Sequence, residues 1–178
     1  MTATSADFAI AAIKGRRVWD SRGRPTVEAE VTLSGGAMGR AIAPAGASRG
    51  SNEAIDLRDG GPRFGGWDVT DALKATNGAI ADRLKGMNAA DQGAVDQAML
   101  DLDGTPNKAE LGGNATIAVS MACLHAAASQ AGQPIWQYLW ETGGKTGTPL
   151  LPLPEIQIFG GGAHAGRRVD VQDFMVMA

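Results

Sequence analysis

The sequence has little of what zinc-binding, disulfide-rich and nucleotide-binding proteins need. Its single cysteine, Cys123, cannot form a disulfide within the chain, and its alanine-rich surroundings indicate a small buried side chain. Of the two histidines, His164 has no second histidine or cysteine at the spacing of a zinc site, and His125, within the alanine-rich helical stretch, is expected to be structural. A GxxxxGK(S/T) phosphate-binding loop and a GxGxxG turn before a helix are both missing. These absences disfavour all three classes.

Strongly charged and strongly apolar segments are also missing. The net charge is −3 at pH 7 and the sequence pI is about 5.3, so the chain as a whole is not attracted to nucleic acid or anionic membranes. No apolar run is long enough to span a membrane, and residues 1–9 lack the basic start of a signal peptide. We therefore expect a cytoplasmic protein with no nucleic-acid or membrane partner. Any anionic ligand must be held by local charge.

What is present is a hydrophobic content of 44%, enough for one substantial core and one or two domains. The first third of the chain has the pattern of a three-stranded antiparallel meander. Residues 10–20 hold a mixed apolar and basic run, and residues 27–33 alternate between apolar and polar side chains. Residues 38–43 return after a turn signal at 34–36, and Pro44 ends this third strand.

Helices are predicted after a long glycine-rich loop at residues 45–66; loops of this length in compact domains are usually functional or disordered. Apolar residues at helical spacing then indicate four helices. Asp68 or Thr70 would cap the first, Asp91 the second and Asn114 the third. The predicted helices span residues 69–84, 91–103, 115–131 and 135–140.

Strands followed by helices predict an α+β domain over residues 1–142. The Gly/Thr/Lys-rich residues 143–150 would be a linker. Residues 151–178 hold two short apolar runs, 155–159 and 169–177, on either side of a glycine-rich turn. The second run alternates with a period of two, as a strand does. The pattern alone favours a hairpin-like connection with a surface histidine in the turn.

Several motifs occur in one order along almost the whole chain. They are DSRGRPTVE at residues 20–28, PAGASRGS at 44–51, LDGTPNK at 102–108, LGGNA at 111–115, and the LPLP start, GGxHA turn and QxFM end of 151–178. Together they closely resemble the enolase family, and the combination is far more specific than any one motif. The resemblance implies that the α+β region, a small sheet packed on a helical bundle, is the N-terminal domain of that family.

The same resemblance implies that residues 151–178 are the opening strands of an incomplete enolase-type (β/α) barrel. A closed barrel of this kind needs roughly 250 residues. We therefore expect the chain to be a fragment of a longer protein. Two isolated strands rich in apolar residues would expose those side chains and form an aggregation-prone edge.

By this resemblance, the loop at residues 46–50 is the mobile loop that closes over the substrate. Gly46, Ala47 and Arg49 would contact the substrate, and the Ser48 hydroxyl would help to ligate the second magnesium ion of the family's Mg²⁺ cofactor. A hydroxyl is a hard oxygen ligand that suits Mg²⁺ but is too weak to hold it alone. Composition by itself favours a flexible Gly/Ser loop here.

His164, Gln172 and Asp173 would line the substrate pocket, again by resemblance; a lone histidine is otherwise more often structural. The family's general base, its general acid and the three carboxylates of its main metal site lie downstream of these motifs. We therefore expect no catalytic residue in this chain and no activity of the 178-residue chain alone. Asp59 and Asp103 match scaffold motifs and are expected to serve turns and caps.

Four residues depart from the family pattern at the expected pocket. Ala45 replaces a serine, Arg49 a threonine, Gly160 an asparagine and Asp173 a glutamate. Aspartate withdraws the carboxylate by one methylene, and a misplacement of about 1 Å can cost on the order of 100-fold in rate. An arginine at position 49 offers a grip on an additional anionic group.

Three functions stay open. The first is an enolase-like lyase that dehydrates 2-phosphoglycerate to phosphoenolpyruvate with Mg²⁺. The second is an enolase paralogue that acts on a related phosphonate or carboxylate, comparable to carboxyphosphonoenolpyruvate synthase. The third is a non-catalytic enolase-like module. The resemblance also implies a small anionic phosphorylated substrate and a homodimer or a ring of dimers.

Overall fold

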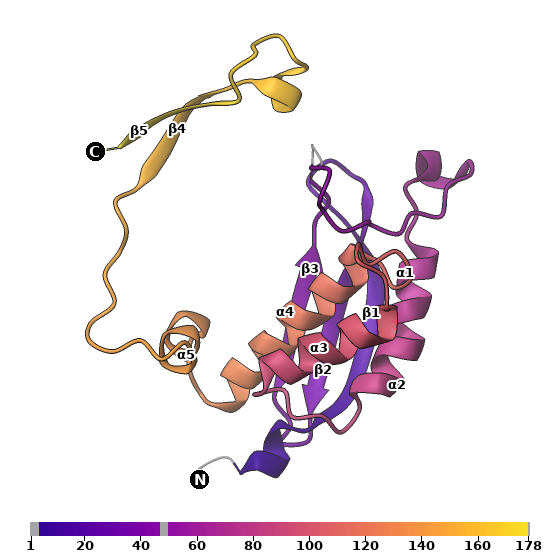
Figure 1. The fold of residues 1–178 in the computed structure, drawn as a ribbon, viewed down its shortest axis with the longest axis vertical. Coiled ribbons are helices and arrows are strands. Elements are labelled where there is room, and N and C mark those ends of the chain that lie inside the picture. The colour runs from indigo at the N-terminus through magenta and orange to yellow at the C-terminus, as the bar shows by residue number, and fades with distance from the viewer. Residues whose placement is uncertain (1–3, 47–49, 178) are drawn as a thin grey trace.

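The computed structural model describes residues 4–46 and 50–177 and opens with a three-stranded antiparallel sheet (Figure 1). The strands are β1 (Ile10–Trp19), β2 (Pro25–Leu33) and β3 (Met38–Ala43), in the spatial order β1-β2-β3. Each strand pairs with the next one in the chain, as short turns between antiparallel strands dictate. The predicted meander is confirmed.

Alternation along β2 buries one complete face of this central strand against the helices. The residues of this face, each at most 1% exposed, are Val27, Ala29, Val31 and Leu33. The alternation predicts that Glu28, on the opposite face of β2, is exposed. Its side chain is only 7% exposed. Arg16 pairs with one oxygen of this carboxylate, and the Arg40 Nε lies 3.6 Å from the other. Two cations therefore offset the cost of burying this charge.

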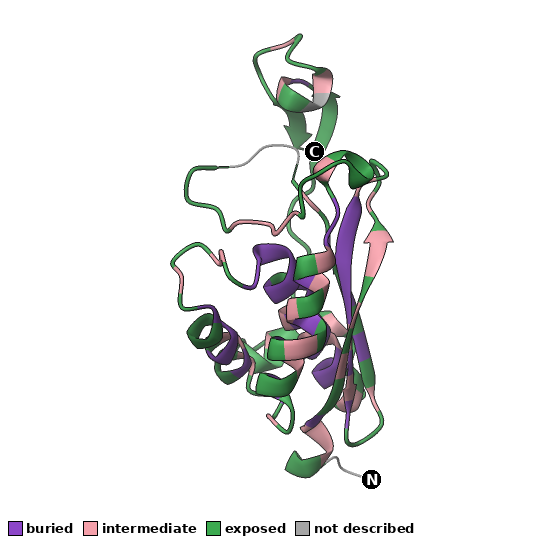
Figure 2. Ribbon diagram, turned by 90° about the vertical axis from the view of Figure 1, so that its right-hand side faces the viewer, coloured by how far each residue is buried: buried purple, intermediate pink, exposed green. Residues whose placement is uncertain are grey.

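The alanine-rich helix α4 (Gly113–Gln130) lies lengthwise on the sheet (Figures 1 and 2). Its small side chains let the helix backbone come close to β3. At the nearest point, a Cβ atom added to Gly39 would lie 2.1 Å from the Ala126 nitrogen and 2.2 Å from the Ala122 oxygen. Glycine at this position is therefore what allows the helix to sit so deeply on the strand.

The remaining helices cover α4 and the edge of the sheet near β1. The helices α1 (Thr70–Ala75) and α2 (Ala81–Leu84) are joined by a π-helical turn at Thr76–Ile80 and make one helical run. The other two are α3 (Gln92–Asp103) and α5 (Ile135–Thr142). Short 3₁₀ turns occur at Ser5–Phe8, Arg63–Gly66 and Gly162–Ala165. Four helical segments and the α+β class agree with the sequence prediction.

One of the predicted helix caps is confirmed and two are wrong. Asp91 caps α3 by accepting a hydrogen bond from the Ala94 nitrogen at 3.0 Å. Neither Asp68 nor Thr70 caps α1, because the residue before the helix is Val69 and no side chain next to it in sequence serves the first turn. Instead Asp59, from the loop, accepts hydrogen bonds from the backbone nitrogens at positions 70 and 71, at 2.9 and 3.1 Å.

Asn114, predicted to cap α4, lies inside the helix, whose N-cap residue is Gly112. Its side chain ties the helix to the preceding loop: the amide oxygen accepts from the Leu57 nitrogen at 3.2 Å, and the amide nitrogen donates to the Leu57 oxygen at 3.0 Å. Asp68 is likewise used elsewhere. It is buried between Arg17 and Arg63, whose Nε atoms lie 2.7 and 3.1 Å from its carboxylate.

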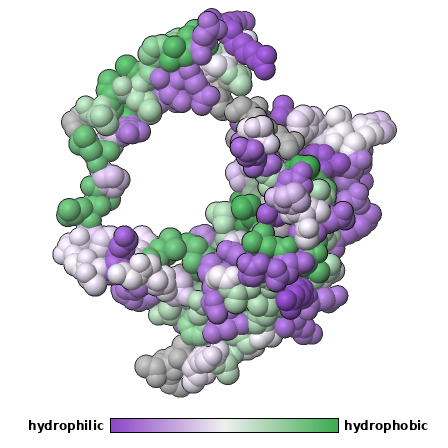
Figure 3. All heavy atoms as spheres, viewed as in Figure 1, coloured by the Kyte–Doolittle hydropathy of each residue, from purple (hydrophilic) through white to green (hydrophobic). Residues whose placement is uncertain are grey.

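Beyond α5, an exposed segment at residues 143–154 leads to a two-stranded antiparallel hairpin (Figure 1). Its strands are β4 (Glu155–Gly160) and β5 (Asp173–Met177), and every residue of both is exposed. The second strand begins four residues later than the predicted run 169–177, because the chain between the strands is turn. Figure 3 shows apolar residues along the segment and the hairpin.

The expected barrel strands are not visible as such in this chain. In the described residues, β4 and β5 pair only with each other. Their apolar side chains face solvent. This is the exposed, aggregation-prone edge that was expected for two isolated strands. Within residues 4–46 and 50–177, none of the helices combines the length and apolarity that a transmembrane span needs.

Candidate functional site

Both ends of the predicted closing loop are tied to neighbouring segments. The Arg22 Nη1 donates to the Ala45 oxygen at 2.9 Å, just before the loop. Gly50 is the last residue of the loop, and its nitrogen donates to the Glu53 Oε1 at 2.8 Å. The predicted contact residues Ala47 and Arg49, and the predicted metal ligand Ser48, lie outside the described residues. Gly46 is described and exposed. The turn between β1 and β2 therefore holds the chain just before the loop, whereas the contact of Gly50 is local.

The turn between β1 and β2 supplies arginines next to this loop. The Asp20 Oδ1 accepts hydrogen bonds from the backbone nitrogens of Arg22 and Arg24 at 2.8 and 2.9 Å. The hydrogen bond from the Arg24 backbone is the main reason why the pKa of Asp20 lies below its usual value. The ionised aspartate thus stabilises the turn that carries both arginine side chains toward the loop.

A pocket of about 300 Å³ opens beside the first residues of the loop; we call it the lid-side pocket. Two arginines and an aromatic ring lie on its wall. The guanidinium carbon of Arg24 lies 4.3 Å from the Trp67 ring centroid, and that of Arg58 lies 5.6 Å from it. The rest of the lining is Pro44, Ala45, Gly46, Glu53, Ala54 and Asp56. Sequence analysis missed this pocket, because Arg24 and Trp67 share no spacing pattern.

The predicted pocket residues of the C-terminal segment lie on the hairpin. The Asp173 carboxylate accepts hydrogen bonds from the Gln157 amide and, at 3.3 Å, from the Gln172 amide. Gln172 and Asp173 are both exposed. The side chain of His164 lies outside the described part of the structure. Among residues 4–46 and 50–177, no hydrogen bond or ion pair joins the hairpin to residues near the loop. That the loop residues and the hairpin residues together form one site therefore stays a prediction.

A magnesium site needs several oxygen ligands at one point, usually including carboxylates. In the described parts of the chain, no three His, Cys, Asp or Glu side chains gather at metal-binding distance. The carboxylates nearest the loop are already engaged, Glu53 with Gly50 and Asp56 with Arg58 at 3.4 Å. The described residues thus do not fit a primary Mg²⁺ site.

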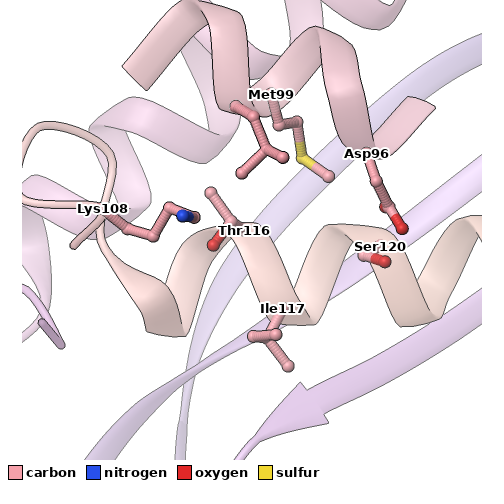
Figure 4. Close-up of a pocket in the computed structure, with 7 residues that line it drawn as sticks. Asp96, Met99, Lys108, Thr116, Ile117 and Ser120 are labelled. Atoms are coloured by element: carbon pink, nitrogen blue, oxygen red, sulfur yellow. The ribbon is translucent and has the colours of Figure 1, made fainter. Parts of the chain in front are cut away.

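A second pocket, of about 240 Å³, lies between α3 and α4 (Figure 4). Its walls are mostly apolar and include Met99, Leu100 and Ile117. Figure 4 shows Lys108 near one end and Asp96 close to Ser120 at the other. The lining holds no histidine or cysteine and no carboxylate paired with a base, so it lacks the groups for acid–base or nucleophilic catalysis.

Asp103 organises the loop that leads from α3 into α4. It accepts hydrogen bonds from the Thr105 nitrogen at 3.0 Å, the Thr105 hydroxyl, and the Leu111 nitrogen at 2.7 Å. Burial by itself raises the pKa of Asp103, but these hydrogen bonds outweigh it and lower the pKa below its usual value. Asp103 and the helix-capping Asp59 therefore have the turn and cap roles that the sequence predicts.

Comparison with known protein families agrees with the folded domain. A family model described as "Enolase, N-terminal domain" matches residues 10–139. The matched region runs from the first residue of β1 into α5 and contains the sheet, the loop and the helices that cover the sheet. It is well over half of the 178 residues. The chain therefore belongs to the enolase family.

Proposed function

We propose that this chain is part of an enolase-like lyase that dehydrates 2-phosphoglycerate to phosphoenolpyruvate with Mg²⁺ as cofactor. The observation that carries the proposal is the family match over residues 10–139. The hydrogen bond from Arg22 to the Ala45 oxygen, just before the loop, supports it, since a closing loop needs a fixed hinge. A cytoplasmic homodimer or ring of dimers that binds a small phosphorylated anion is part of the same proposal.

In this proposal the residues of the chain bind and enclose the substrate. Gly46, Ala47 and Arg49 would contact it when the loop closes, and the Ser48 hydroxyl would complete the ligand set of one magnesium ion. Closure excludes water and strengthens the electrostatic contacts of the substrate inside the site. Magnesium, when bound, would supply positive charge to the carboxylate and phosphate oxygens.

The hairpin residues would complete the enclosure from the other side. His164 and Gln172 would face the phosphate or the departing hydroxyl, and the Asp173 carboxylate would lie near that hydroxyl. The general base, the general acid and the main metal ligands are not assigned to residues of this chain. We expect them from sequence that follows residue 178 in the full-length protein.

A second candidate is a paralogue with a related phosphonate or carboxylate substrate. In support of this candidate, the Asp173 carboxylate accepts hydrogen bonds from the amides of Gln157 and Gln172, and its side chain is one methylene shorter than that of glutamate. A carboxylate in this position reaches less far, so a reshaped substrate would suit it better. The substitutions Ala45 and Arg49 in the loop favour the same candidate.

The loop assignment is tested in the full-length protein with Ser48→Ala. This change removes one hydroxyl and should raise the magnesium concentration needed for half-maximal turnover and lower the rate. Ser51→Ala is the matched control, because Ser51 is an exposed serine of the same segment with no predicted contact to metal. If both variants keep the magnesium dependence of the parent protein, the assignment of Ser48 is wrong. If neither the parent nor the variants turn over 2-phosphoglycerate, the lyase proposal itself fails.

A further inference from the structure

The charged groups of the lid-side pocket are unequally committed. Arg58 is used by the scaffold: its Nη1 donates to the Pro25 oxygen at 2.6 Å and to the Trp67 oxygen at 3.0 Å. Its Nη2 lies 3.4 Å from the Asp56 carboxylate, so that the two charges offset each other. Arg58 and Asp56 therefore form a neutral, structural part of the wall.

Arg24 differs from Arg58 in this respect. Its backbone nitrogen is bound by Asp20, but its guanidinium has no hydrogen bond or ion pair with any residue in 4–46 or 50–177. It lies over the face of Trp67, at 4.3 Å from the ring centroid, and is attracted electrostatically by the nearby Asp20 carboxylate. Stacking on an aromatic ring orients a guanidinium and leaves the N–H groups around its edge available. In the described part of the chain, the pocket thus contains a preoriented cation that forms no direct ion pair.

Glu53 is the one lining group that opposes an anionic ligand. Its Oε1 accepts the hydrogen bond of the Gly50 nitrogen at 2.8 Å, which uses part of its capacity. The remaining negative charge favours a small anion that binds on the Arg24 side of the pocket. The volume of about 300 Å³ is ample for one tetrahedral or planar oxyanion with its nearest waters.

We propose that the lid-side pocket is an oxyanion site, in which the guanidinium of Arg24, steadied by Trp67, binds a phosphate, phosphonate or carboxylate group. A planar guanidinium matches two oxygens of such a group, and the pair is stronger than a neutral hydrogen bond. Because Ala45 and Gly46 also line the pocket, the bound group would lie against the beginning of the closing loop. The inference rests on the proposed function only for this link to the substrate.

The direct test uses the chain with inorganic phosphate as the probe. Tryptophan fluorescence reports binding, because a ligand on Arg24 changes the contact between Arg24 and the Trp67 ring. The Trp67→Phe variant shows how much of the emission comes from Trp67. We expect a saturable change in fluorescence as phosphate is added. Arg24→Ala should weaken phosphate binding by about tenfold or more, and Arg24→Lys by less, since charge is kept and the planar fork is lost.

Two further variants make the test specific. Arg83→Ala is the matched control: it removes an exposed arginine of α2 that does not line the pocket, and should leave phosphate binding unchanged. Glu53→Gln keeps an acceptor for the Gly50 nitrogen and removes the opposing charge, so it should tighten binding several-fold. No saturation in the parent chain, or equal affinity in the parent and Arg24→Ala, would overturn the proposal.

The source of the oxyanion is settled in the full-length protein. If the group belongs to the substrate, phosphate competes with substrate, and Arg24→Ala raises KM at nearly constant kcat. If it is a separate small anion, KM is unchanged and the effect of phosphate on turnover disappears with Arg24. Phosphate binding without dehydration of 2-phosphoglycerate would refute the proposed function alone. Normal turnover with no phosphate binding through Arg24 would refute this inference alone.

Discussion

Gly39 lies where α4 comes closest to the sheet, and Gly39→Ala tests how firmly that contact defines the domain. The new methyl group would lie 2.1 Å from the Ala126 nitrogen and 2.2 Å from the Ala122 oxygen. Both are backbone atoms of a helix, so no side chain can rotate away and α4 itself must move. Adding atoms to a packed core usually costs about 1–3 kcal/mol. We expect a loss near the upper end, about 3 kcal/mol.

The assay is denaturant unfolding of the parent and variant chains. Gly78→Ala is the matched control, because nothing lies within 4 Å of the Cβ that it adds. Gly78 lies in the helical run between α1 and α2, so alanine there should stabilise the chain by about 0.5–1 kcal/mol through helix propensity. If Gly39→Ala loses less than about 1 kcal/mol, α4 does not pack on β3 as closely as the structure indicates.

Three other predictions concern single side chains. Asp59→Ala should destabilise the chain by about 1 kcal/mol in the same unfolding assay, because it removes the cap that serves the first turn of α1; an unchanged midpoint would exclude this role. Asp103→Asn should cost about 2 kcal/mol at neutral pH, since the buried Leu111 nitrogen loses an ionised acceptor. The pKa of Asp103 is lowered on folding, so the stability that its ionised carboxylate contributes is present above the ordinary pKa of 3.8 and is lost as the pH falls through the folded value. Below about pH 4, Asp103→Asn should therefore lose stability less steeply than the parent chain. Identical acid unfolding of the two chains would contradict the assignment. Burial raises the pKa of the Cys123 thiol to about 12, so a thiol reagent at pH 8 should label Cys123 only at the rate of unfolding; rapid labelling of the native chain would show that Cys123 is accessible.

The sequence predicts those parts of the fold whose signals are local. The alternation in residues 27–33 identifies β2 and its buried face, because one side of the strand must meet the helices. Asp91 and Gly104 mark the ends of α3, because a cap and a left-handed glycine act on their immediate neighbours. The π-helical turn at 76–80 follows no local signal and was not predicted.

A turn or cap role is predicted for Asp59, but the distant partners of such side chains were not predictable. Asp59 caps α1 from a loop eleven positions earlier in sequence than Thr70, so no capping motif contains both. Asp68 fits a cap by its position, yet the arginines of β1 and of the loop draw it into a buried ion cluster. In the candidate site, the motifs predict roles for the loop and the hairpin residues, and these roles stay predictions. The stacking of Arg24 on Trp67 appears only when the two segments are folded together.

The rate of phosphoenolpyruvate formation from 2-phosphoglycerate by the full-length protein tests the lyase proposal most directly. We predict slow formation that requires Mg²⁺. Asp173→Glu should raise the rate by roughly tenfold to 100-fold, because the longer side chain restores reach toward the departing hydroxyl. Background rates in both the parent protein and Asp173→Glu, at saturating Mg²⁺ and substrate, would contradict the account and favour the paralogue with a different substrate.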